Sequence, residues 1–228
     1  MTGRDNELWQ QSWRDRNTDF HQKAVNPHLV RFWSGLGLAP AARVFVPLCG
    51  KSLDMLWLAQ QGHAVIGVEL SPLAVRAFFR ENRMQPTRRR VGAFMLWEHG
   101  RIAILCGDFF QLAAGDLGDI AAVFDRAALT ALPDDLRAAY LLHLRRIVPA
   151  ACRILLLTAE EPEAWETADQ PFAVAAEITT LYADAYDIRL DHVESFFEAD
   201  PDPASREQIR VEHKVYRLTP KASAQDIA

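Results

Sequence analysis

Cysteine is scarce in this chain of 228 residues, and its three copies stand far apart. Cys49, Cys106 and Cys152 are odd in number, and the sequence has no C-x-x-C or H-x-x-x-H pair. These patterns exclude a small fold held together by disulfides and give no sign of a zinc site, so we expect no metal. Unpaired cysteines are typical of a reducing compartment, and we expect a cytoplasmic protein.

The chain also lacks an excess of positive charge and any long apolar run. Its net charge is −5, and its one basic run is Arg88-Arg89-Arg90, which we interpret as a solvated face. No apolar run approaches the roughly 20 residues of a membrane span. The N-terminal residues MTGRDNELWQQSWRDRN are too polar for a secretory signal. We therefore expect neither nucleic acid nor membrane as a partner.

The glycine-rich motifs of common nucleotide sites are missing as well. Residues 43–52 read RVFVPLCGKS, whose end resembles a phosphate-binding loop. That loop needs a further glycine five positions before Gly50, and the residue there is Phe45. A G-x-G-x-x-G turn, which a dinucleotide requires, is absent too. The pattern therefore disfavours an ATPase and a nucleotide-dependent oxidoreductase.

What is present is a regular alternation of strand and helix patterns. Half of the residues are hydrophobic, enough for a sizeable core. Strands alternating with helices predict a mostly parallel, doubly wound sheet with right-handed crossovers. A hairpin turning at His99-Gly100 interrupts the alternation, and two late strands, 186–197 and 208–218, predict an antiparallel hairpin. The predicted strands and helices are 43–48, 53–61, 63–70, 71–79, 120–125, 133–147, 153–159 and 175–185.

The first 40 residues form a distinct helical segment rich in tryptophan. Trp9 and Trp13 share one helix face. Asn26-Pro27 has the form of an N-cap followed by proline at the first helical position. This segment is either a helical cap packed on the core or an aromatic lid over a ligand.

An acidic residue stands at the end of the second predicted strand, 63–70. Glu69 lies 19 residues after Gly50 (69 − 50 = 19), where a doubly wound fold places a carboxylate that hydrogen-bonds a ribose. The alternative is a favourable position at the start of the helix that Ser71-Pro72 opens. Asp108 is placed to reach an adenine. With a single glycine in the turn, the ligand is predicted to be a nucleoside carrying a short amino-acid tail.

Several stretches together resemble the thiopurine S-methyltransferase family in its bacterial form. They are WQQSW, DFHQKAVNPHLVRFW, VFVPLCGKSLDMLWLAQQGHAVIGVELSPLAV, CGDFFQL, FDRAALTALP and HKVYRL, and they span Trp9 to Leu218. The resemblance implies a class I S-adenosylmethionine-dependent methyltransferase fold, a seven-stranded sheet with an N-terminal helical cap. The sequence shows no domain boundary, so we expect one domain, with residues 1–40 as cap or lid, 41–218 as Rossmann-like core and 219–228 as a frayed tail.

The resemblance also implies the chemistry. The methyl donor is S-adenosyl-L-methionine, the product is S-adenosyl-L-homocysteine, and the acceptor is a thiopurine or another aromatic or heterocyclic thiol. A monomer and a role in detoxification follow by the same resemblance. The residues that match the family's cofactor contacts are Trp13, Leu48, Glu69, Asp108, Phe109 and Arg126.

Two residues match the acceptor side, and we predict them as catalytic. Phe20 matches a phenylalanine that lies against the acceptor, and Arg126 matches the arginine where cofactor and acceptor meet. Without the motif, Arg126 would be interpreted as forming a structural ion pair with Asp125 or Asp134. His21 is interpreted as a hydrogen-bonding strut.

The sequence leaves other readings open. Asp19 stands where the family commonly has glycine. The connection 160–172 varies strongly in such proteins, so the resemblance assigns no acceptor contact to it. A methyltransferase for selenium, tellurium or halide species is an alternative, as is a non-catalytic protein that binds S-adenosylmethionine.

Overall fold

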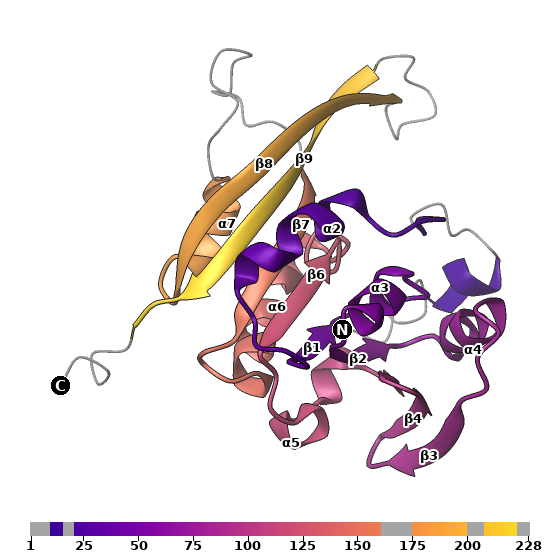
Figure 1. The fold of residues 1–228 in the computed structure, drawn as a ribbon. Coiled ribbons are helices and arrows are strands. Elements are labelled where there is room, and N and C mark those ends of the chain that lie inside the picture. Colours follow the sequence, from indigo (N-terminus) through magenta and orange to yellow (C-terminus); the bar gives the residue numbers. More distant parts are fainter. Residues whose placement is uncertain (1–9, 16–20, 161–174, 200–207, 223–228) are drawn as a thin grey trace.

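In the computed structural model, helices flank a single mixed sheet (Figure 1). The structure describes residues 10–15, 21–160, 175–199 and 208–222. After a short helical segment at residues 10–14, the helices are α2 (Pro27–Phe32), α3 (Asp54–Gln60), α4 (Pro72–Glu81), α5 (Ala114–Leu117), α6 (Asp134–Ile147) and α7 (Ala176–Tyr182), with 3-10 turns η1 (Trp33–Leu36) and η2 (Phe109–Gln111). The strands are β1 (Arg43–Val46), β2 (Ala64–Glu69), β3 (Thr87–Val91), β4 (Phe94–His99), β5 (Ile102–Cys106), β6 (Ala122–Arg126), β7 (Arg153–Glu160), β8 (Tyr186–Ala199) and β9 (Gln208–Pro220).

The sheet has the strand order β3-β4-β5-β2-β1-β6-β7-β9-β8. Strands β5, β2, β1, β6 and β7 are parallel, which confirms the predicted parallel centre. The predicted C-terminal hairpin is β8 and β9, which are antiparallel to each other, and β9 also pairs antiparallel with β7. The chain order reverses between β1 and β6, and this switch point is where ligands bind in such sheets.

The sheet has two strands more than the expected seven, because β3 and β4 extend it beyond β5. The hairpin of β4 and β5 was predicted, but β3 contains the arginine run that we interpreted as a connection. Its residues Thr87–Arg90 are exposed, as expected of a solvated face. An edge strand can be held by backbone hydrogen bonds on one side, so β3 lacks the apolar alternation that reveals a half-buried strand.

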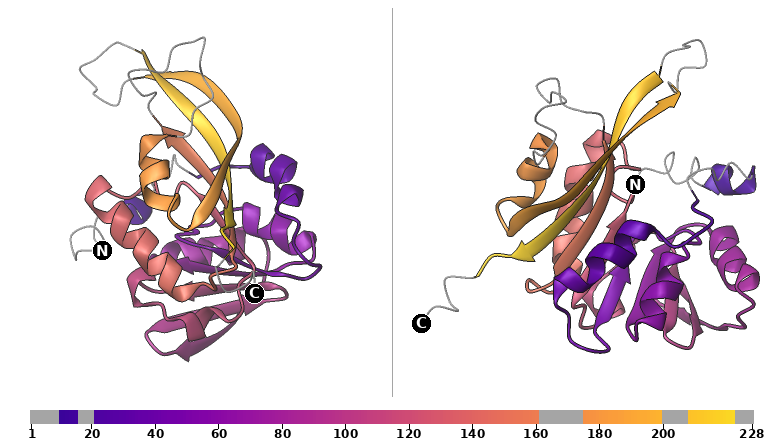
Figure 2. Two further views of the ribbon diagram at one scale, coloured as in Figure 1. Left: turned by 90° about the vertical axis from the view of Figure 1, so that its left-hand side faces the viewer. Right: turned by 45° about the horizontal axis from the view of Figure 1, so that its top comes forward.

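Helices cover both faces of the sheet (Figure 2). One face carries α5, α6 and α7, whose buried side chains include Tyr140, Leu144 and Tyr182. The other carries α2, η1, α3 and α4. None of the helices within the described ranges is long and apolar enough to cross a membrane.

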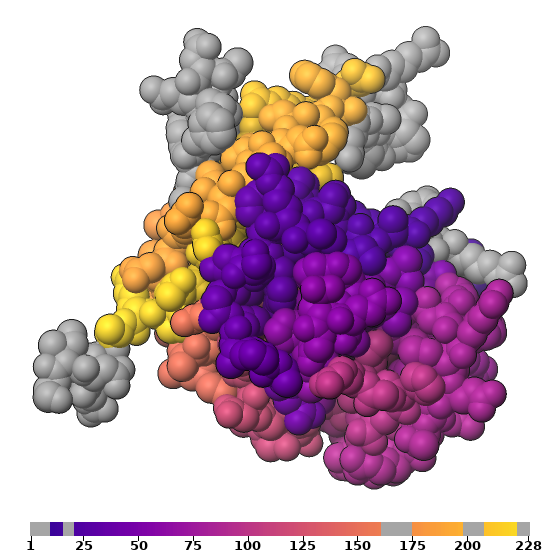
Figure 3. All heavy atoms as spheres, in the orientation of Figure 1, coloured from indigo at the N-terminus to yellow at the C-terminus, as the bar shows by residue number. Residues whose placement is uncertain are grey.

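Part of the N-terminal segment belongs to the core. Leu29, Trp33 and Leu36 are buried against the sheet, and the Trp33 indole donates a hydrogen bond of 2.9 Å to His63. The predicted N-cap is present, since the Asn26 side chain accepts from the His28 N–H. In Figure 3 this indigo segment lies between the magenta core and the orange and yellow hairpin. Strand β9 runs to Pro220, and the end of the predicted frayed tail, 223–228, lies outside the described residues.

Candidate active site

The turn after β1 has an unusual backbone. The strand ends at Val46 rather than at the predicted Leu48, and Leu48 and Gly50 both have positive φ, 45° and 53°. A side chain in the left-handed region costs free energy, and such residues gather at functional sites. A Cβ placed on Gly50 would lie 3.3 Å from the Trp13 ring, so that indole rests directly on the turn.

Glu69 joins this turn to the end of β2. Its carboxylate accepts a hydrogen bond from the Gly50 N–H at 2.9 Å and another from the Ser71 N–H at 2.6 Å. Burial raises the pKa of Glu69 to about 7, although these backbone donors favour the charged form. A carboxylate has about four acceptor positions. The two backbone bonds therefore leave acceptor capacity for hydroxyl groups of a ligand.

Arg126 closes the site at the end of β6. Its Nε donates to the Asp54 carboxylate at 2.8 Å. Asp54 is almost fully buried and also accepts from the Ser52 hydroxyl at 3.0 Å and from the Asn26 N–H at 2.8 Å. One carboxylate thus holds the arginine, the turn after β1 and the start of α2. Ala127, the next residue, has a φ of 62°.

The ion pair of Arg126 exists, but both partners named from the sequence were wrong. Asp125 is the neighbouring residue on β6 and points to the opposite face, where it accepts from the Tyr140 hydroxyl at 2.7 Å. Burial raises the pKa of Asp125 to about 6. Asp134 pairs with Arg137. Asp54 was missed because its position in the first turn of α3 indicates only a favourable helix charge.

The turn after β1, the end of β2 and the end of β6 line one hollow at the carboxyl ends of these three strands. It encloses about 810 Å³ of space, which includes open solvent at its mouth. Of the predicted site residues, Trp13, Leu48, Glu69 and Arg126 line it. Its apolar wall near Arg126 is formed by Ala127, Ala128 and Ala131.

His21, for which the sequence favoured a hydrogen-bonding strut over a general base, also lines this hollow. Burial lowers the pKa of His21, and the positive charge of Lys51 acts in the same direction. Both effects favour the neutral imidazole, which can accept a proton. The sequence offers one signal for this position, since His21 follows Phe20 directly.

Asp108 and Phe109 are not among the described residues that line the hollow. Asp108 caps η2, where its side chain accepts from the Phe110 N–H at 3.0 Å. Phe109 is buried, and its ring centroid lies 4.9 Å from that of Tyr140. Both follow β5, the neighbour of β2, so they lie along the same sheet edge as Glu69. Their assignment to the adenine side stays a prediction, and Phe20 lies outside the described residues.

The fold has many solved relatives among methyltransferases. A SAM-dependent methyltransferase from Anabaena variabilis superposes with a TM-score of 0.60 at 15% identity, over 93% of this chain and 94% of its own. The 1,6-didemethyltoxoflavin-N1-methyltransferase of Burkholderia thailandensis, solved with 1,6-didemethyltoxoflavin and S-adenosylhomocysteine, gives 0.59 at 16% identity, over 94% and 87%. Identities this low show the fold alone, and they confirm the predicted class I methyltransferase fold.

Sequence similarity is far more specific. A thiopurine S-methyltransferase of Stutzerimonas stutzeri is 59% identical over 224 residues, which are 98% of this chain and 94% of its own length. The thiopurine S-methyltransferase of Bordetella petrii is 45% identical over 94% of this chain and 98% of its own. The model of the family described as thiopurine S-methyltransferase matches residues 4–221. The chain therefore belongs to the thiopurine S-methyltransferase family.

Proposed function

We propose that this protein is an S-adenosylmethionine-dependent methyltransferase that methylates the sulfur of thiopurines or other aromatic and heterocyclic thiols. The observation that carries the proposal is the arrangement of the turn after β1, the buried Glu69 carboxylate and Arg126 around one hollow. This arrangement occurs in a chain that shares 59% of its residues with a thiopurine S-methyltransferase.

The residues present fit S-adenosylmethionine. Glu69 retains acceptor capacity toward the hollow and would bind the ribose hydroxyl groups. Trp13 and Leu48 supply apolar surface on either side of the single-glycine turn. That turn has no second or third glycine to admit a pyrophosphate, which separates this donor from a dinucleotide. Asp108 and Phe109 would bind near the adenine.

Arg126 and Phe20 would then bind the acceptor. One of the five guanidinium donors of Arg126 is used by Asp54, so the group is held in place while others can contact an anionic sulfur. Ala127, Ala128 and Ala131 offer a flat apolar surface beside it.

Methyl transfer needs little from the protein beyond alignment. A bound donor would supply a methyl group carried by a positively charged sulfur. The acceptor sulfur would form its bond to the methyl carbon in line as the bond from that carbon to the donor sulfur breaks. An aromatic thiol arrives largely as its anion, and Arg126 favours that form through its charge. Holding the two reactants in line and excluding water can lower the barrier by roughly 7–11 kcal/mol. For a neutral thiol, His21 is placed to accept the proton.

The remaining assignments are part of the same proposal. Three cysteines without disulfides fit a cytoplasmic protein. The family resemblance favours a single methyltransferase domain acting as a monomer, which light scattering of the purified protein would test.

The experiment that tests the function is a transfer assay with methyl-labelled S-adenosylmethionine. The acceptors are a thiopurine, an aromatic thiol, an aliphatic thiol, selenite and tellurite. We expect label to appear on the thiopurine and the aromatic thiol, with S-adenosylhomocysteine formed in equal amount. Transfer to selenite or tellurite alone would overturn the proposed acceptor, and no transfer with intact cofactor binding would overturn the enzyme assignment.

A further inference from the structure

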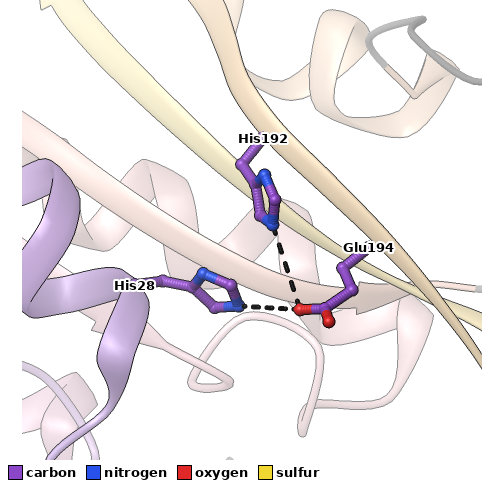
Figure 4. A group of neighbouring side chains, drawn as sticks. All are labelled: His28, His192 and Glu194. Carbon is purple, nitrogen blue, oxygen red and sulfur yellow. Dashed lines mark ion pairs between the residues drawn. The ribbon is translucent and has the colours of Figure 1, made fainter.

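Outside the hollow, three side chains with metal-binding chemistry converge from two distant parts of the chain. His28 comes from α2, and His192 and Glu194 come from β8 (Figure 4). The Nε2 atoms of His28 and His192 lie 3.6 Å and 3.9 Å from the same Glu194 oxygen. One ligand atom of each residue lies within 4.8 Å of the other two.

The backbone fixes this convergence. His192 and Glu194 are two positions apart on β8 and therefore share one face of the strand. The pairing of β8 with β9 shifts in register between Leu190 and His192. Such an irregularity changes the direction of the side chains that follow it, and His192 is the first of them. On the other side, the His28 N–H is held by the Asn26 side chain, and the Asn26 N–H is held by Asp54. Neither element needs to move for the three side chains to meet.

We propose that His28, His192 and Glu194 form a binding site for a divalent transition metal of the zinc type. Two imidazoles and one carboxylate are a donor set that suits such ions, with Zn–N and Zn–O distances of about 2.0–2.2 Å. Those lengths place tetrahedral ligands about 3.3 Å apart. The two distances to Glu194 are already close to this value, so small side-chain rotations complete the set and leave further positions for water.

The surroundings of the site suit a reversible ion. The side chains of His28 and His192 are 16% and 23% exposed and that of Glu194 is 47% exposed, so an ion can enter from solvent. The Phe32 ring, 5.7 Å from the His192 ring, forms an apolar wall on one side. Burial lowers the pKa of His28, and His192 contributes in the same direction, which favours the neutral imidazole that metals require.

Neighbouring charges set the expected pH dependence. Glu194 attracts a cation, whereas His213 and Arg31 also face His28 and oppose one when they are charged. Protons compete with a metal for the ring nitrogens, so metal affinity should fall as the pH is lowered. The competing explanation is a plain ion pair, in which Glu194 is shared by protonated histidines without any metal.

The test is a titration of the full chain with Zn²⁺ and with Co²⁺ after treatment with a chelator. Saturating S-adenosylhomocysteine occupies the hollow, so that His21, Glu69 and Cys49 do not compete for the ion. We expect one equivalent to bind and raise the unfolding temperature. The Co²⁺ complex should show no charge-transfer band from sulfur, because its ligands are nitrogen and oxygen.

Variants locate the ion. His192→Gln and Glu194→Gln should each weaken Zn²⁺ binding on the order of tenfold or more. The control is His99→Gln, which removes an exposed histidine at the turn between β4 and β5. It should bind Zn²⁺ as the unaltered chain does. Metal-free methyl transfer reports that each variant is folded, since none of these residues lines the hollow.

Four results would overturn the site: no binding by the unaltered chain, unchanged binding in both β8 variants, an equal loss in His99→Gln, or a sulfur charge-transfer band. If one β8 variant fails to fold, His28→Gln tests the same ion from helix α2.

Discussion

At the scale of single residues, the two charged groups of the hollow differ in what they retain for a ligand. Arg126 is already paired with a buried carboxylate, so its removal leaves Asp54 without a counter-charge. Glu69 accepts hydrogen bonds from backbone N–H groups, and burial makes its charge unfavourable. Arg126 therefore combines a structural role with a proposed role in binding the acceptor. Glu69 is held by the backbone in a buried position that raises its pKa.

Replacing Arg126 should separate these two roles. Arg126→Ala leaves a buried charge unpaired and should lower the free energy of unfolding by about 3–5 kcal/mol. Arg126→Lys keeps the charge near Asp54 but cannot present a planar fork, so it should lose less stability. With an acidic thiol as acceptor, kcat/KM of Arg126→Lys should still fall by about 1–3 kcal/mol in transition-state free energy.

A neutral acceptor supplies the control for this series. If Arg126 binds an anionic sulfur, the lysine variant should lose more with the acidic thiol than with the neutral acceptor. Equal losses for both acceptors, together with a lower unfolding temperature, would assign Arg126 to the scaffold alone.

The raised pKa of Glu69 predicts a specific dependence of stability on pH. Folding raises this pKa from its ordinary value of 4.5 to about 7. Between these values the unfolded chain releases the proton before the folded one does, so this residue makes stability fall as pH rises. The full effect is on the order of 3 kcal/mol, and it is complete above about pH 7.

Glu69→Gln should remove that slope. Chemical unfolding at intervals from pH 4 to 8 measures it as the difference between the variant and the unaltered chain. Asp125, whose pKa burial also raises, to about 6, contributes a similar fall in both proteins and cancels in the difference. A difference that stays constant with pH would show that folding does not shift the pKa of Glu69.

At the scale of elements, the turn after β1 combines an unusual backbone with five consecutive residues, 48–52, that line the hollow. Leu48 and Gly50 both adopt positive φ, and Trp13 lies against Gly50. Glycine at position 50 is thus required twice, by its backbone and by the indole above it.

Gly50→Ala tests this with a matched control. Gly92 has the same φ, 53°, but a Cβ there meets nothing within 4 Å. Both substitutions should cost about 1–2 kcal/mol of stability through the backbone alone. Only Gly50→Ala should also displace Trp13, and we expect its dissociation constant for S-adenosylhomocysteine to rise about tenfold, or 1.4 kcal/mol. Equal affinity in both variants, measured by calorimetry, would mean that Trp13 does not support the cofactor site.

The elements also show what sequence reasoning can reach. Apolar periodicity and caps predicted β2, α4 and α6 closely, because Ser71 and Pro72 mark a helix start and because a buried face repeats at helical spacing. The same reasoning missed β3, whose residues are nearly all polar. It also missed Asp54 as the partner of Arg126, since that contact joins residues 72 positions apart and depends on how α3 packs beside β6. The position of Glu69 at the hollow was predicted because it follows from spacing along the chain.

At the scale of the whole molecule, the N-terminal segment is tied to both ends of the sheet. Asn26 is bound to Asp54 at the hollow, and Arg153 and Arg217 donate to backbone carbonyls at Gly37 and Gly35. The first bond attaches the start of α2 to α3, and the other two attach η1 and the residue after it to β7 and β9. Leu29, Trp33 and Leu36 thus pack into the core, whereas Trp13 and His21 lie at the wall of the hollow, and a lid role for that part of the segment stays a prediction.

Hydrogen exchange with S-adenosylhomocysteine should resolve the segment into these two parts. Amides of residues 29–36 should exchange slowly with and without ligand, because Leu29, Trp33 and Leu36 are buried in the core. Amides of residues 10–15 and of His21 should slow on binding, because Trp13 and His21 line the hollow and gain a packing partner there. Helix α7, on the opposite face, is the internal control and should not change. Equal slowing across residues 10–36 would instead mean that the whole segment closes as one lid, and no slowing at 10–15 would mean that Trp13 is a packing residue.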